Sequence, residues 1–139
     1  MAVFMNNLVG LKVATIDLSD HVTSVTLNRT FDELEITAMG DLGHKFVKGL
    51  EASSITIDFL SDTAAANVNA TLQAAFGTAV TVTMVQSKGT AVSATNPLYT
   101  MTCLVNGLTD VNGAVGDLGT QSVTWTVNGV VTVASTGTF

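Results

Sequence analysis

Alternation of apolar and polar side chains is the dominant pattern in this chain, and it predicts strands. Residues 54–60 read SITIDFL, with Ile55, Ile57 and Phe59 on one face and polar side chains between them. This pattern is typical of a half-buried strand. Comparable runs predict four more strands, over residues 8–16, 22–28, 78–86 and 98–105.

Helical spacing is convincing in one segment. Val68, Leu72 and Phe76 recur at helical intervals, after the capping side chains of 61–63 and before Gly77. Capping residues at the start and glycine at the end are the usual boundaries of a helix. The pattern therefore predicts one helix over about 64–76.

The end of the chain carries a hairpin signal. The segments SVTWTV and VVTVAS flank the dipeptide Asn128-Gly129. Asn-Gly fits a two-residue type I′ turn, because both of its residues tolerate positive φ. We therefore expect the last two strands to pair with each other.

Residues 29–50 differ from the rest of the chain. They read RTFDELEITAMGDLGHKFVKGL, in which charged and apolar residues alternate before the glycine-containing turn region 40–43. Because charged residues occur throughout this segment, it does not suit a strand buried in a core. The segment is predicted to be a long hairpin, or arm, that leaves the body.

Together these elements predict a mainly β fold. About seven strands and one helix favour a β-sandwich or a partly open barrel, with one flanking α-helix and a long projecting arm. A length of 139 residues suits one domain that spans residues 1–139.

Charge is distributed very unevenly. Charged residues make up 12% of the chain, and residues 63–139 carry only Lys88, Asp110 and Asp117. A soluble domain usually has about a quarter of its residues charged, so this half is expected to be covered or to associate. The net charge of −6 argues against an electrostatic grip on nucleic acid. No stretch approaches the roughly 18 apolar residues of a membrane span.

Candidate chemical groups are few. Cys103 stands alone, which excludes an internal disulfide, and it lies in a strand pattern as a small buried hydrophobe would. His21 lies beside Asp17 and Asp20, which are interpreted as turn formers rather than metal ligands. His44 lies in the charged arm, where a solvated or subunit-facing role is expected. We predict no enzyme, no catalytic residue, no cofactor and no metal site.

Five segments occur in an order that resembles a known family. They are DLSDHVTSVTLNRTFDELEITAMGD, GHKFVKGLEASSITIDFLSD, LQAAFGTAVTVTM, SATNPLYTMTCLVNGL and GDLGTQSVTWTVNG. Together, over about 17–129, they resemble the major tail protein, or tail tube protein, of long-tailed bacteriophages. The most specific parts are D-x-x-D-x-V at 17–22, TAMGD at 37–41, SATNPLY at 93–99 and GDL at 116–118.

The resemblance implies a structural role in the virion tail, after assembly in the host cytoplasm. Proteins of this family form homo-hexameric rings that stack into a hollow tube, with sheets from six subunits joined into an inner barrel. The lumen holds the tape measure protein and passes DNA during ejection without specific binding, and other tail proteins cap the tube ends. Arm 29–50 would reach the neighbouring ring, through the expected contact residues Phe31, Glu33, Met39, Lys45, Phe46 and Lys48.

Physical arguments favour association independently of the resemblance. Uncharged strands leave unpaired backbone groups at a sheet edge unless another chain pairs with them.

Two other classes remain as alternatives. One is a capsid decoration or receptor-binding β-sandwich, which would not need the arm, and the other is the tube protein of a contractile tail or related secretion apparatus.

Overall fold

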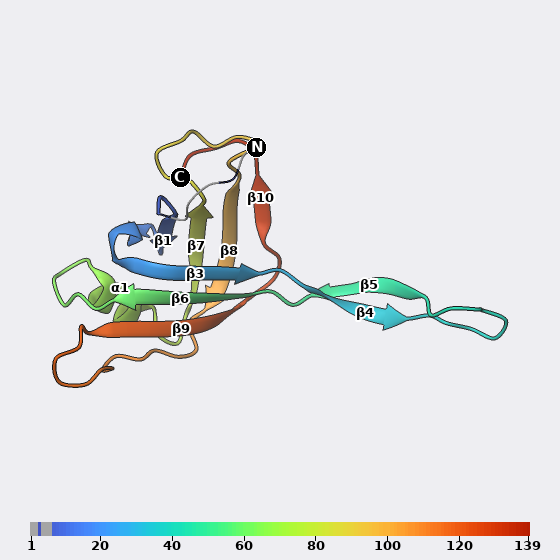
Figure 1. The fold of residues 1–139 in the computed structure, drawn as a ribbon, viewed down its shortest axis with the longest axis horizontal. Coiled ribbons are helices and arrows are strands. Elements are labelled where there is room, and N and C mark those ends of the chain that lie inside the picture. Colours follow the sequence, from blue (N-terminus) through green and yellow to red (C-terminus); the bar gives the residue numbers. More distant parts are fainter. Residues whose placement is uncertain (1–2, 4–6) are drawn as a thin grey trace.

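The structure, a computed structural model, describes residues 3 and 7–139. Within that part it contains ten strands, one α-helix and a short 3-10 helix (Figure 1). The elements in chain order are β1 (Gly10–Val13), β2 (Ile16–Asp17), the 3-10 helix (Ser19–His21), β3 (Val22–Asn28), β4 (Phe31–Glu35), β5 (Phe46–Glu51), β6 (Ser54–Leu60), α1 (Val68–Ala75), β7 (Ala79–Val85), β8 (Leu98–Leu104), β9 (Thr120–Val127) and β10 (Thr132–Ala134).

Eight strands form one antiparallel sheet that folds over on itself. Their order is β2-β1-β7-β8-β9-β6-β3, and β10 also pairs with β8. β8 and β9 share only the pairs Cys103↔Val127 and Leu104↔Thr126, so the sheet turns a corner there. On one side of the corner β3, β6 and β9 run across the direction of β7 and β8 (Figure 1). The predicted class, a β-sandwich or partly open barrel with one flanking helix, is confirmed.

The core lies between the two layers of this folded sheet. Ile55, Ile57 and Phe59 of β6 are fully buried, as their alternation predicts. Trp125 of β9 is also fully buried, and its indole N–H donates to the Gly107 carbonyl at 3.3 Å. The side chains of α1 that pack against the core are Val68, Thr71, Leu72 and Ala75.

Strand β3 has the predicted bounds and contains one irregularity. Val22 is opposite Phe59, whereas Ser24 is opposite Asp58, so the register shifts between Val22 and Ser24. A bulge of this kind lets one residue leave the strict alternation. It accounts for the position of Val22, which packs against the core together with Val25 and Leu27.

Two predicted boundaries near α1 and β1 are wrong. The helix starts at Val68 rather than near 64, because Asp62 accepts the Ala64 N–H at 2.9 Å and forms a turn before the helix. The predicted strand over 8–16 is a tight hairpin instead. Ala14 and Thr15 form its two-residue turn with φ of 51° and 72°, a type I′ geometry built without glycine.

The predicted terminal hairpin is also wrong. β10 does not pair with β9; both strands run antiparallel to β8, and Thr132 is opposite Thr100. Only Gly129 of the Asn-Gly pair has positive φ, at 106°, so the type I′ turn is not formed. The Glu51 carboxylate accepts the Val131 N–H at 2.8 Å. This hydrogen bond stabilises the interruption between β9 and β10, after which the chain continues along β8.

The arm is a separate two-stranded sheet made of β4 and β5. It projects from the ends of β3 and β6 along the longest axis of the molecule (Figure 1). All five residues of β4 are exposed. The predicted projecting hairpin is therefore confirmed as a structural element.

Candidate functional site

The two faces of the arm differ in chemistry. Cross-strand pairs place Glu33 beside Lys48 and Glu35 beside Phe46 on one face, and Leu34 beside Val47 on the other. Leu34 is 53% exposed and Val47 is 43% exposed, and neither side chain belongs to the core. A two-stranded hairpin is only marginally stable by itself in water, so an apolar face of this kind favours a partner.

The charged face also carries aromatic side chains. The Lys48 ammonium lies 5.6 Å from the centre of the Phe31 ring, within the range of a cation–π contact. The His44 ring donates a hydrogen bond from Nδ1 to the Glu35 carboxylate at 2.6 Å, and its ring centre lies 6.3 Å from that of Phe46. This face therefore mixes charge with aromatic surface.

Asp41 orders the tip of the arm. Its carboxylate accepts the Ala38 N–H at 2.8 Å and pairs with the Lys45 ammonium at 2.8 Å. The Lys45 and Ala38 interactions hold the pKa of Asp41 below its usual value of 3.8. This turn leaves the side chains of Met39 and Leu42 fully exposed.

The structure brings together most of the predicted contact residues. Phe31, Glu33, Phe46 and Lys48 lie on the charged face, while Met39 lies at the tip. Lys45 is engaged with Asp41 inside the arm. Whether these six residues contact another ring stays a prediction.

Leu42 is the residue that sequence reasoning missed. It lies in the turn between Gly40 and Gly43, where no strand or helix pattern gives an apolar side chain a role. Leu42 and Met39 are both fully exposed at the tip, and it is such a group of exposed apolar side chains, rather than a single one, that indicates an external contact.

The main sheet has open edges. β3 pairs with β6 on one side and with no strand of the described chain on the other. Its sequence VTSVTLN contains no charged residue, so it lacks the charges that usually protect an edge. β2 lies at the other end of the strand order and β10 is a separate edge beside β8, and both are short. These edges are available for pairing with another chain.

The outer face of β3, β6 and β9 is polar and nearly uncharged. Aligned rows across the three strands join Thr26, Thr56 and Thr124, and next to them Ser24, Asp58 and Ser122. None of these strands contains Lys or Arg. The face is therefore a smooth hydroxyl surface with one carboxylate.

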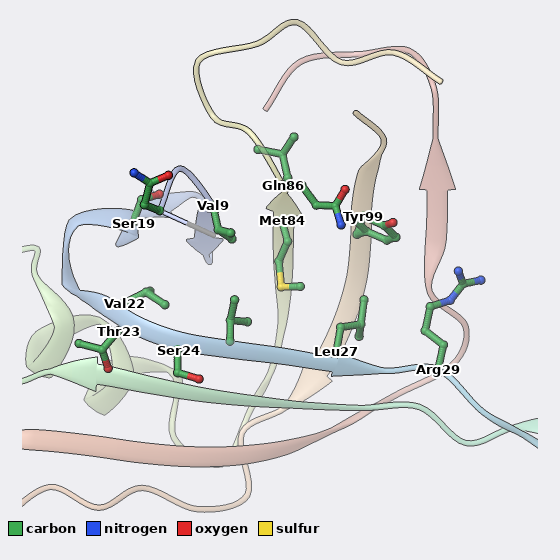
Figure 2. A pocket seen from close by; sticks show the side chains of 13 residues that line it. Val9, Ser19, Val22, Thr23, Ser24, Leu27, Arg29, Met84, Gln86 and Tyr99 are labelled. Atoms are coloured by element: carbon green, nitrogen blue, oxygen red, sulfur yellow. The ribbon is translucent and has the colours of Figure 1, made fainter. Parts of the chain in front are cut away.

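A cavity of about 510 Å³ lies between β3 and the ends of β7 and β8. Met84 extends from β7 toward β3, and Tyr99 lies on β8 (Figure 2). Apart from the Tyr99 phenol, Arg29 is the only titratable side chain in its lining. The lining offers no pair of nucleophile and base, and the cavity lies beside the unpaired edge of β3.

The remaining chemical groups have structural contacts. His21 bonds Asp62 at 2.8 Å rather than Asp17 or Asp20, and Asp17 accepts from Ser19 and pairs with Lys88. Burial raises the pKa of the Cys103 thiol to about 11, so this thiol is unreactive at neutral pH.

Residues 3 and 7–139 contain no group of three His, Cys, Asp or Glu side chains placed to hold a metal ion. In the same part of the chain, no helix is long and apolar enough to cross a membrane.

Comparison with known proteins supplies the remaining evidence. No family model and no curated protein sequence matches the chain. Its fold is similar to a chain from the virion of a native gene transfer agent particle, with a TM-score of 0.76, 8% identity, and coverage of 95% of this chain and 99% of that one. It is also similar to a chain from the tail of an empty gene transfer agent particle, computed with helical refinement and C6 symmetry. There the TM-score is 0.66 and the identity is 10%, over 94% of this chain and 98% of the other. The chain thus has the fold of proteins found in phage-like virions and tails.

Proposed function

We propose that this protein is a non-enzymatic structural subunit of a bacteriophage tail tube, and that the whole chain 1–139 is one tube domain. The likeness to a virion chain over 95% of its length is the observation that carries the proposal. The second similar chain comes from a tail with C6 symmetry, which supports homo-hexameric rings. Such rings stack into the tube through the arm.

Ring closure requires sheets of neighbouring subunits to pair. The free edge of β3 offers seven uncharged residues to the next subunit. β2 lies at the other end of the strand order, and β10 is a separate edge beside β8. Backbone pairing across subunits removes the unpaired edges. Uncharged strands make this contact without the desolvation of charged side chains.

The lumen of the proposed tube holds the tape measure protein and passes DNA. The outer face of β3, β6 and β9 suits such a wall, because it carries Asp58 and no cation. A wall with Lys or Arg would bind phosphates by counterion release. A hydroxyl surface with net negative charge lets the genome slide.

Electron microscopy of the purified protein tests the proposal. Rings or tubes about 100 Å wide are expected, which is the scale of six such domains around a channel. A protein that stays monomeric at high concentration, including in the presence of tail initiation components, would overturn it. Binding of such a monomer to capsids would instead favour a decoration protein.

A further inference from the structure

A second, smaller hollow lies beside α1, where the helix meets the sheet. It has a volume of about 250 Å³ and lies between the helix, the β1–β2 turn and the start of β7. Small-molecule sites usually occupy about 300–1,000 Å³, so this hollow suits one or two side chains. Its lining, called here the α1 groove, consists of Ala14, Ile16, Ala66, Ala70, Thr71, Ala74, Ala75, Thr78 and Val80.

The α1 groove is almost entirely apolar and contains one unsatisfied polar atom. Ala70 and Ala74, one helical turn apart, are exposed on its helix side. Thr71 is 5% exposed, and its hydroxyl has no hydrogen-bond partner among the described residues. Because its lining is apolar and its volume is small, the groove suits an occupant that has exposed apolar side chains and a turn already fixed in shape.

The arm tip has both features. Met39 and Leu42 are fully exposed. Gly40 between them has a φ of 92°, and a Cβ atom added there would meet no other atom within 4 Å. Its peptide groups are therefore accessible. Because Asp41 fixes the turn through Ala38 and Lys45, little conformational entropy is lost when the tip docks.

The tip and the groove lie at opposite ends of the molecule. α1 lies at one end of the longest axis and the arm extends from the other (Figure 1), so one subunit cannot join its own tip to its own groove. Two complementary patches at opposite ends produce a head-to-tail contact, which repeats along a stack when its rotation does not close a ring. Stacking along this axis carries the tip of one copy toward the α1 end of the next.

We infer that the arm tip of one subunit inserts Met39 and Leu42 into the α1 groove of a subunit in the adjacent ring. This inference rests on the proposed tube function and names the receiving surface of the arm. The contact is apolar on both sides, so it forms without an ion pair between subunits.

Disulfide trapping between two singly substituted proteins tests the contact. A Leu42→Cys protein and an Ala70→Cys protein are mixed, assembled, and oxidised under mild conditions. A covalent dimer is expected on a non-reducing gel, because a disulfide forms only where Cα atoms lie within about 7 Å. The native Cys103 stays silent, because it is fully buried and the pKa of its thiol is about 11.

Two control pairs locate the contact. Leu42→Cys is also mixed with Val115→Cys, which lies in the loop between β8 and β9, and with Leu27→Cys, which lines the cavity beside β3. Neither pair should cross-link. Tubes that form normally but cross-link only with a control, or with none of the partners, overturn the inference and leave the tube function standing. Absence of tubes from the unsubstituted protein contradicts the proposed function instead.

A filled groove provides a second test. Ala70→Leu places a larger side chain at an exposed helix position and should leave the monomer folded by circular dichroism. It should reduce the yield of tubes at least tenfold, whereas Ala70→Ser at the same position should keep the yield within twofold. An Ala70→Leu protein that elongates normally would exclude the groove as the docking surface.

Discussion

Glu51 connects the root of the arm to the body. Its carboxylate accepts the Val131 N–H at 2.8 Å and the Ser53 hydroxyl at 3.0 Å. The bond from the Val131 N–H contributes most, followed by that from Ser53, and together they hold the pKa of Glu51 below its usual value of 4.5. The stability that such a carboxylate contributes is fully present at pH values above its pKa in the unfolded chain. It is lost as the pH falls through its lower pKa in the folded protein.

We predict that Glu51→Ala lowers the melting temperature at pH 7 more than Glu51→Gln does, because the amide still offers an oxygen to the Val131 N–H. Thermal unfolding monitored by circular dichroism checks this order. The difference between the native protein and Glu51→Gln should shrink as the pH falls below 4.5. A difference that does not depend on pH would contradict a role for the charge.

Thr15 is held in a strained backbone conformation. Its φ of 72° is unfavourable for a β-branched residue, and left-handed geometry costs about 1–2 kcal/mol in a residue with a Cβ. We predict that Thr15→Gly stabilises the protein by roughly 0.5–1 kcal/mol, after the entropy of glycine in the unfolded chain is subtracted.

Urea unfolding measures the effect of Thr15→Gly. Thr63→Gly is the matched control, because Thr63 is exposed and does not have positive φ. The control should be neutral or destabilising. Equal effects of the two changes would show that the turn stores no strain.

Strands with strict alternation were predictable, because their pattern reflects burial against one core. β6 has the predicted bounds, and so does β3 despite its register shift after Val22. The arm was recognisable because its charges exclude it from a core. The partner of β10 was not predictable from local sequence, since its pairing with β8 depends on Glu51, which is 80 positions from Val131. The turn at Ala14 and Thr15 carries no turn residue, so no local signal marks it.

The arm is expected to act as an element independent of the body. We predict that Phe46→Asp leaves the body folded, because Phe46 is 53% exposed and lies in the separate β4–β5 sheet. It should block elongation, because the charge would be buried in the contact between rings. Circular dichroism and electron microscopy together check both parts. Phe46→Tyr is the control and should elongate, and unchanged tubes of Phe46→Asp would remove this residue from the contact.

The uneven charge now has a structural counterpart in the whole molecule. Residues 63–139 supply α1 and strands β7 to β10, which provide much of the core and the α1 groove. The arm carries seven of the charges: Arg29, Asp32, Glu33, Glu35, Asp41, Lys45 and Lys48. Assembly is therefore expected to depend on apolar surface and backbone pairing more than on ion pairs.

Salt tests this expectation. At about 1 M salt the Debye length is near 3 Å, which suppresses attraction between exposed charges. We predict that tubes persist, and that elongation becomes faster, because salt screens the repulsion between subunits with a charge of −6. Light scattering follows the rate, with buffer at about 0.1 M salt as the reference. Disassembly at high salt would show that ion pairs hold the rings together.

The root of the arm has a mechanical consequence. Glu51 lies in β5, and its carboxylate holds the Val131 N–H in the segment that joins β9 to β10. A pull on the arm therefore loads a strand that is paired along β8, in addition to the strands β3 and β6 from which the arm extends. In the proposed tube, tension along the stack of rings would therefore be shared between both layers of the folded sheet.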